Sequence, residues 1–152
     1  GTNPTLYYQI GSTVGSARRA ATNSGAGRWN AVAVPGTFPA WSSGKPVNVA
    51  ITEWSAADTY EAVTSFSCSS GLYTSNKTTI TWNSPSPGGI GSNTTALRMV
   101  ATHEFGHAYG LNDMSTTCNG TKTVMVQGKT KWSCSWGTEP WQDDINGVDA
   151  IY

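Results

Sequence analysis

The chain has 152 residues, a length that suits a single domain with a hydrophobic core. Its formal net charge is zero and only 12% of its residues are charged, which argues against a nucleic-acid-binding surface or one that docks on anionic membranes. No apolar run approaches the ~20 residues of a membrane span. The many small polar residues favour a secreted, extracellular protein, and the chain begins without a signal peptide, as a processed form would.

The N-terminal part predicts a strand followed by a long helix. Residues 5–10, "TLYYQI", are aromatic and aliphatic and precede a glycine, which is typical of a strand. Apolar residues then recur every three to four positions over about 14–30, which predicts a helix. Gly25 and Gly27 each cost about 1 kcal/mol in a helix, so a break near 23–27 is expected.

Three further strands are predicted between residues 46 and 83. Residues 46–53 alternate apolar and polar side chains, and residues 62–68 and 78–83 are rich in β-branched and aromatic types. The prolines and glycines of residues 84–93 predict a loop.

Two helices are predicted in the remainder. The first covers about 94–110, with a stripe of apolar residues facing a core and a possible cap at residues 92–94. The second covers the sequence "WQDDINGVDAIY", residues 141–152. Asp143 and Asp144 lie in its first turn, where the helix dipole favours negative charge.

Both histidines of the chain lie on the first of these helices, four residues apart. At this spacing His103 and His107 project side by side and can share one Zn²⁺ at about 2.0–2.1 Å. Glu104 lies at the edge of that site, where it can accept a proton. Gly110 can end the helix with positive φ, which brings Asp113 round as a third ligand. The alternative is a surface helix with two solvated histidines.

The three cysteines allow one disulfide and one free thiol. Cys118 and Cys134 are closest in sequence and are the favoured pair, and a loop of that length contributes roughly 3 kcal/mol. The alternative is three reduced, buried thiols. A zinc-finger framework is not supported, because no C-x-x-C pair is present.

The sequence "HEFGHAYGLND" resembles the H-E-x-x-H-x-x-G-x-x-H/D signature of the metzincin zinc endopeptidases. The stretch "VATHEFGHAYGL" is similar to the active-site helix of matrixins, and the aspartate in third place resembles the small snapalysin-type neutral proteases. Met125, in "TVMVQG", resembles the methionine of the metzincin Met-turn. The first strand and helix and the C-terminal "DDINGVDAIY" are similar to those of matrixins, so the likeness covers most of the chain.

This resemblance implies an α+β fold and a single catalytic domain over residues 1–152. The sheet is expected to be twisted and mixed, mostly parallel, with four to five strands. It is accompanied by an active-site helix, a long N-terminal helix and a C-terminal helix. The upper part would cover about 1–110 and a smaller lower part about 111–152. The protein is expected to be a monomer.

The function implied is that of a secreted zinc metalloendopeptidase, a peptide-bond hydrolase with one catalytic Zn²⁺ held by His103, His107 and Asp113. Glu104 would activate the zinc-bound water. A protein or peptide substrate would lie antiparallel to an edge strand, with 63–68 the preferred edge and 78–83 the alternative. Nucleic acid and membrane are not expected as partners.

Several features depart from the matrixin pattern. Asp113 replaces a third histidine, so the bound water should be less acidified than under three imidazoles. Gln127 stands where some metzincins carry a tyrosine ligand, so none is assigned. Ca²⁺ is possible, but no calcium loop is recognisable. Cys68 is not expected to act as the switch cysteine of a propeptide.

Four alternatives stay open. The scaffold could serve as a non-catalytic, metal-stabilised binding or adhesion module, although Glu104 counts against a purely structural site. The third ligand could be Glu139 or Asp143. Met125 could be an ordinary core residue. The tryptophans could bind carbohydrate, with those that follow the Met-turn the ones to watch: Trp132, Trp136 and Trp141.

Overall fold

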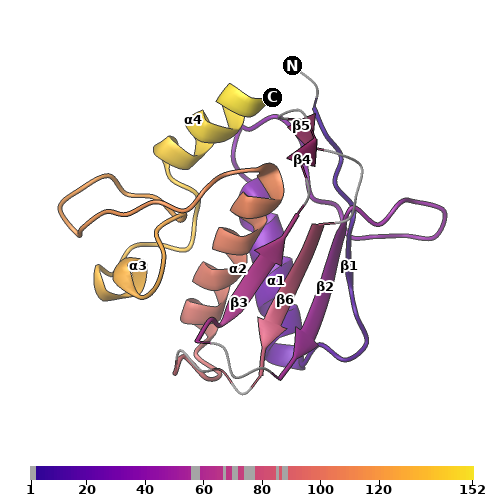
Figure 1. The fold of residues 1–152 in the computed structure, drawn as a ribbon, viewed down its shortest axis with the longest axis horizontal. Coiled ribbons are helices and arrows are strands. Elements are labelled where there is room, and N and C mark those ends of the chain that lie inside the picture. Colours follow the sequence, from indigo (N-terminus) through magenta and orange to yellow (C-terminus); the bar gives the residue numbers. More distant parts are fainter. Residues whose placement is uncertain are drawn as a thin grey trace.

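The fold is known from a computed structural model that describes residues 3–55, 59–66, 68–69, 72–73, 78–84, 86 and 89–152. The long helices and the sheet strands fall where the sequence predicted them (Figure 1). The elements are β1 (Tyr8–Ile10), α1 (Ser16–Asn30), β2 (Val49–Trp54), β3 (Ala62–Ser65), β4 (Cys68–Ser69), β5 (Leu72–Tyr73), β6 (Thr78–Asn83), α2 (Thr94–Tyr109), α3 (Thr130–Ser133) and α4 (Gln142–Ile151).

The main sheet has four strands in the order β1-β2-β6-β3. The β1–β2 and β2–β6 pairs are parallel, and the β6–β3 pair is antiparallel. The predicted α+β class with a mixed, mostly parallel sheet is therefore confirmed. Strand β3 lies at an edge and β6 lies inside the sheet, so only the first of the two candidate edge strands has a free edge among the described residues.

Helices α1 and α2 lie side by side behind one face of the sheet (Figure 1). Alternation in β2 and β6 turns Val49, Ile51 and Ile80 into the core. Two tryptophans link the layers by hydrogen bonds as well as by packing. Trp29 Nε1 of α1 donates to the Thr102 carbonyl of α2 at 2.8 Å, and Trp82 Nε1 of β6 donates to Thr22 Oγ1 of α1 at 3.1 Å.

The break expected near residues 23–27 does not occur, because α1 runs without interruption from Ser16 to Asn30. The physical reason is the packing of α1 on α2. A Cβ added at Gly25 would lie 2.7 Å from the backbone carbon of Ala101, so only glycine allows the helices to approach this closely. Tertiary contact thus outweighs the low helix propensity of this position.

Helix α2 begins and ends at residues suited to those positions. The side chain of Asn93 caps its start by accepting from the Ala96 N–H at 3.1 Å. Gly110 ends it in the left-handed conformation that the sequence predicted, with φ of 99°. Of the described residues, no helix is long and apolar enough to span a membrane.

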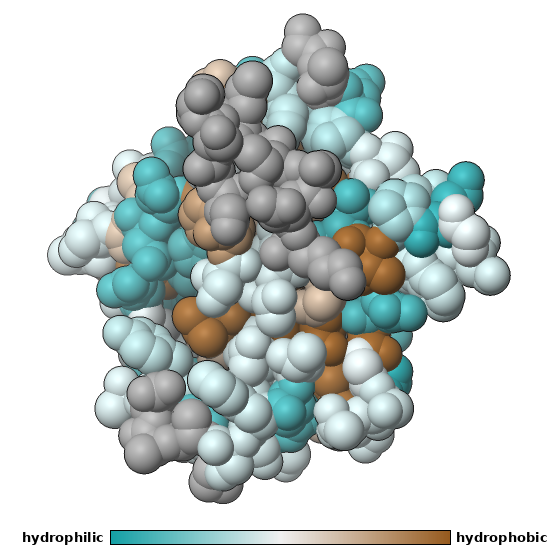
Figure 2. Space-filling view, turned by 45° about the vertical axis from the view of Figure 1, so that its right-hand side comes forward, coloured by the Kyte–Doolittle hydropathy of each residue, from teal (hydrophilic) through white to brown (hydrophobic). Residues whose placement is uncertain are grey.

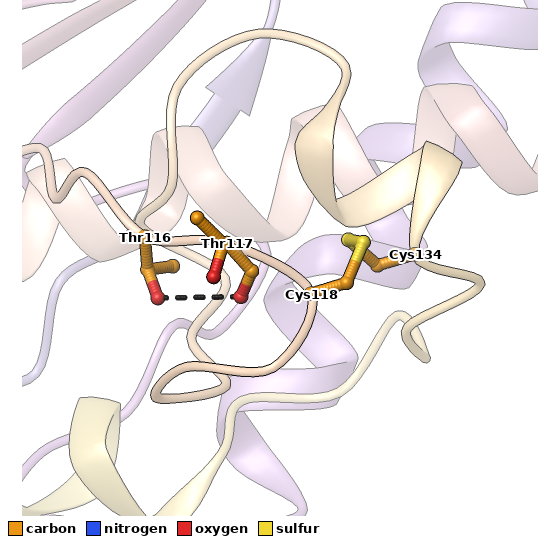
Figure 3. Close-up of a disulfide and its surroundings, with 4 residues drawn as sticks. All are labelled: Thr116, Thr117, Cys118 and Cys134. Atoms are coloured by element: carbon orange, nitrogen blue, oxygen red, sulfur yellow. Dashed lines mark hydrogen bonds between the residues drawn. A yellow bond between two sulfur atoms is a disulfide. The ribbon is translucent and has the colours of Figure 1, made fainter.

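The C-terminal segment carries a disulfide between Cys118 and Cys134, with their Cα atoms 5.2 Å apart (Figure 3). The favoured pairing is therefore confirmed. The bridge closes a loop that contains Met125 and helix α3. Neither this helix nor the β4–β5 hairpin was predicted from sequence. The division into an upper and a lower part at about residue 110 stays a prediction.

Removing the disulfide is expected to destabilise the protein. Changing Cys118 and Cys134 together to alanine should lower the free energy of unfolding by about 3 kcal/mol, because the unfolded chain gains the freedom of the opened loop. Denaturant unfolding of the double variant measures the change. Cys68→Ala is the control, and an equal loss in that variant would contradict the assignment of the effect to the bridge.

Candidate metal centre

The two histidines of α2 are held in a defined tautomer by backbone carbonyls. His103 Nδ1 lies 2.8 Å from the Val124 oxygen, and His107 Nδ1 lies 2.7 Å from the Leu111 oxygen. A carbonyl can only accept, so both Nδ1 atoms carry the hydrogen. Both Nε2 atoms then present a lone pair, and they lie 3.1 Å apart. Two facing lone pairs repel unless a cation or proton lies between them.

Asp113 joins these two nitrogens after the turn at Gly110. Its Oδ1 lies 3.3 Å from His103 Nε2 and 3.4 Å from His107 Nε2. Its Oδ2 accepts from Gln127 Nε2 at 2.6 Å. The His103 imidazole, when it is protonated, and the amide of Gln127 lower the pKa of Asp113 to about 2, against its partial burial, which raises it. The carboxylate is therefore ionised at neutral pH.

The spacing of these three donor atoms fits one zinc ion. A tetrahedron with bonds of 2.0–2.1 Å places its ligand atoms about 3.3–3.4 Å apart, and the observed separations are 3.1, 3.3 and 3.4 Å. Within the part of the chain that the structure describes, His103, His107 and Asp113 are the one group of three metal-ligating side chains that converge in this way. The donor set of two imidazoles and a carboxylate is one that zinc accepts.

Glu104 lies beside this group, almost fully buried, with 4% of its surface exposed. Its Oε2 accepts from Thr64 Oγ1 at 2.6 Å, and the same hydroxyl contacts the Glu104 carbonyl at 3.2 Å. Thr64 belongs to the edge strand β3. The Glu104 carboxylate is therefore held by β3 on one side, while α2 carries it from the other. The general-base role predicted for Glu104 stays a prediction.

A groove of about 760 Å³ opens over the three metal-ligating side chains and Glu104. One wall comes from the β3 region and includes Tyr60 and Val63; the other comes from residues 127–132 and includes Trp132. These three side chains are well exposed. The fourth position of a tetrahedral ion here would therefore be accessible to a ligand in the groove.

Met125 is buried against the helix that carries both histidines. Met125 is 2% exposed, and a Cβ added at Gly106 would lie 2.3 Å from its sulfur. The methionine thus packs directly against α2 at Gly106, the residue before His107, and its role as a Met-turn stays a prediction. Gly106 is the helix position that makes room for it.

A buried carboxylate connects α4 to the metal-ligating histidines. Asp144, which is 2% exposed, accepts from the N–H groups of Trp141 at 2.7 Å and Val124 at 3.0 Å and from the hydroxyl of Thr123. The carbonyl of Val124 is the one that orients His103. Asp144 is therefore a positioning residue that acts on His103 through the backbone of a single residue, Val124.

Changing Asp144 to Asn is expected to lower the free energy of unfolding by about 2–3 kcal/mol, because an amide cannot accept all three hydrogen bonds. Zinc affinity should fall about tenfold as His103 loses its orientation. Equilibrium dialysis and thermal unfolding measure the two effects. The exposed neighbour offers the control Asp143→Asn, expected within about 0.5 kcal/mol of wild type. Equal effects of the two substitutions would argue against this connection.

Lys131 also lines the groove and was not predicted from sequence. Only 6% of its surface is exposed, and its Nζ donates to the Val126 carbonyl at 2.9 Å. Burial lowers the pKa of this amine to about 8, although the charges of Glu104, Asp113 and Asp144 oppose that shift. In the sequence, only its position six residues after Met125 could have indicated that Lys131 lies near the site.

The alternative third ligands lie elsewhere. Glu139 forms an ion pair with Arg28 of α1, and Asp143 is exposed in the first turn of α4. Of the three tryptophans after the Met-turn position, only Trp132 is among the described residues that line the groove. Trp136 is buried, and Trp141 is half-buried with the Nζ of Lys122 4.8 Å from its ring centroid.

No known protein family and no curated protein matches the sequence. Solved structures do share its fold, with 65 matching chains. One is a chain of a structure described as "GM1 bound form of the ECX AB5 holotoxin", which is 15% identical and matches with a TM-score of 0.62. The match covers 97% of this chain and 80% of that one. At this identity the likeness is one of fold.

This finding points away from the secreted zinc endopeptidase that the sequence led us to expect. The similar structure is described as the GM1-bound form of a toxin. We therefore correct the assignment as a protease, a hydrolase acting on a protein or peptide substrate. The alternative, a non-catalytic binding or adhesion module, agrees better with it. The physical reason is that the motif predicts metal-ligating side chains, whereas the step to a reaction rested on resemblance.

Proposed function

We propose that the chain is a metal-dependent binding or adhesion module on a metzincin-like scaffold, with zinc held by His103, His107 and Asp113. The observation that carries this proposal is the set of donor separations, 3.1–3.4 Å, around two imidazoles whose Nδ1 atoms are both committed to carbonyls. Such fixed orientation by partners behind the ligands is usual in metal sites.

The site would recognise its ligand through the metal. Zinc, when bound, supplies a Lewis-acidic position for an oxygen or nitrogen donor. Glu104 lines the same groove with its Oε2 held by the Thr64 hydroxyl, which leaves Oε1 as the oxygen that can face a ligand. We infer that this oxygen accepts a hydrogen bond from the ligand and so orients it over the metal.

Two further observations support a binding role outside the cell. The AB5 holotoxin structure of similar fold holds GM1, so at least one protein in which this fold occurs binds a ligand. The Cys118–Cys134 disulfide is typical of proteins that fold in an oxidising compartment, which favours secretion. We propose no shared ligand, because fold alone does not carry one over.

The test uses zinc and acetohydroxamate, a small chelating probe for the open position. Chelator-stripped protein should take up one zinc per chain, and acetohydroxamate should bind the zinc-loaded form and not the stripped form in calorimetry. Glu104→Gln should keep one zinc but weaken the probe about tenfold, since a charge-assisted hydrogen bond is lost. Asp143→Asn, an exposed change outside the groove, is the control.

Two outcomes would contradict the proposal. The first is wild-type protein that takes up no zinc after stripping. The second is chelator-sensitive cleavage of casein that Glu104→Gln abolishes, because a binding module has no turnover to lose. A casein assay on the same preparations therefore decides between the module and an enzyme.

A further inference from the structure

The groove contains a buried positive charge that the metal centre does not use. Lys131 has three N–H donors, and one of them, to the Val126 carbonyl, has an acceptor. No carboxylate of the described residues forms an ion pair with it. Burying an ammonium group without a partner is costly, so a position that retains one calls for an explanation.

The surroundings of Lys131 favour an anionic ligand. Glu61, Glu104 and Asp113 bring three negative charges to the groove, Lys129 and Lys131 bring two positive ones, and the zinc of the proposed function would bring two more. Lys131 then leaves the loaded site with a net positive charge. Exposed apolar side chains in the groove walls, among them Val63, Phe66 and Trp132, add contact area but no competing anion.

Among the described residues, Lys131 is the one lysine that is buried. On the face shown in Figure 2, hydrophobic residues form separate patches among polar ones rather than one continuous apolar area. The other buried carboxylate outside the metal centre, Asp144, already accepts three hydrogen bonds. Lys131 differs from it in having unused hydrogen-bonding capacity inside a cavity.

We propose that Lys131 is a ligand-binding residue that anchors a carboxylate of the ligand while a second donor of the same ligand reaches the metal. This inference rests on the proposed function and specifies the chemistry of its ligand. The ligand class is an acidic molecule with two donor groups, such as a dicarboxylate or an acidic side chain next to a carbonyl. Lys131 provides two N–H groups for bonds to the carboxylate.

The experiment compares succinate, glutarate and adipate with their monoamides by calorimetry on zinc-loaded protein. At least one diacid should bind about tenfold more tightly than its monoamide, because the charged partner of Lys131 is lost in the amide. Lys131→Met should remove this preference and keep one zinc per chain. Lys129→Met is the matched control, since Lys129 lines the same groove but is exposed, and it should leave the preference unchanged.

The thermal midpoint of Lys131→Met gives a second readout. Loss of a buried charge that serves binding should leave the midpoint unchanged or higher, whereas a purely structural lysine predicts a lower midpoint with the diacid preference intact. That second pattern would overturn the inference. So would equal binding of diacids and monoamides to the wild type, a comparison that does not depend on the variant folding.

The two proposals can fail separately. Zinc uptake without any diacid preference removes the role of Lys131 and leaves the metal centre standing. If no zinc is taken up, the proposed function fails, and acetate against acetamide on the metal-free protein then tests Lys131 alone. Equal affinity for those two probes would overturn the anion site as well.

Discussion

Zinc at a thousandfold excess over its dissociation constant is expected to raise the free energy of unfolding of the wild-type protein by about 4 kcal/mol, since it binds only the folded state. For a chain of 152 residues this corresponds to an increase in the thermal midpoint of roughly 8–16 °C. Without metal, the two Nε2 lone pairs and the ionised Asp113 face one another. The ion removes that repulsion.

Asp113→Ala should abolish most of this stabilisation. Partners that only orient a metal ligand already contribute 10–100-fold in affinity, so loss of a ligand should weaken zinc by about 100-fold or more. At a fixed zinc concentration that removes about 2.7 kcal/mol. The side chain of Asp113 is 38% exposed, so its truncation leaves little cavity and the metal-free stability should change little.

Thermal unfolding of stripped protein, titrated with zinc, measures both effects, and Asp149→Ala on the exposed face of α4 is the control. Wild-type zinc affinity in the Asp113 variant would exclude this carboxylate as a ligand. The ion pair of Glu139 with Arg28 makes that residue a poor substitute, because it would have to leave its partner.

The convergence of His103, His107 and Asp113 could be predicted from sequence because its geometry is local. Helix periodicity alone places His103 and His107 on one face, and a glycine at the helix end lets Asp113 return to them. The carbonyls that fix both tautomers were not predictable to the same degree. Leu111 follows within the motif, but Val124 arrives through tertiary structure, twenty-one residues away.

The residues that surround the groove could not be predicted from sequence either, because tertiary structure brings them together. Thr64 reaches Glu104 only because β3 takes the edge of the sheet, and Lys131 enters the cavity from a helix of four residues. A helix this short has no periodic pattern to read. The function could not be predicted from the motif alone. Two imidazoles and a carboxylate can serve either a reaction or a binding site, and the rest of the groove decides between them.

The strand and helix predictions show where local propensity loses to packing. Residues 78–83 and the C-terminal helix followed their patterns, but the expected break at Gly25 and Gly27 did not appear. These two glycines look alike in sequence and differ in space. A Cβ at Gly25 would meet the backbone of Ala101 and Thr102 at 2.7–2.9 Å, whereas one at Gly27 would have no atom within 4 Å.

This difference gives a paired prediction within one helix. Gly25→Ala should lower the free energy of unfolding by about 2–4 kcal/mol, because the obstacle is backbone and cannot rotate away. Gly27→Ala should raise it by about 0.5–1 kcal/mol, because alanine is the better helix former and has open space there. Denaturant unfolding of both variants gives the two values under identical conditions.

The effect of Gly25→Ala should reach the metal. Ala101 and Thr102 directly precede His103, so an added methyl group that pushes α2 away from α1 displaces the first imidazole from its Val124 carbonyl. Zinc affinity should therefore fall in this variant and stay at the wild-type value in Gly27→Ala. If the two alanine variants matched in both stability and zinc affinity, the close approach of α1 and α2 would not be what positions the metal centre.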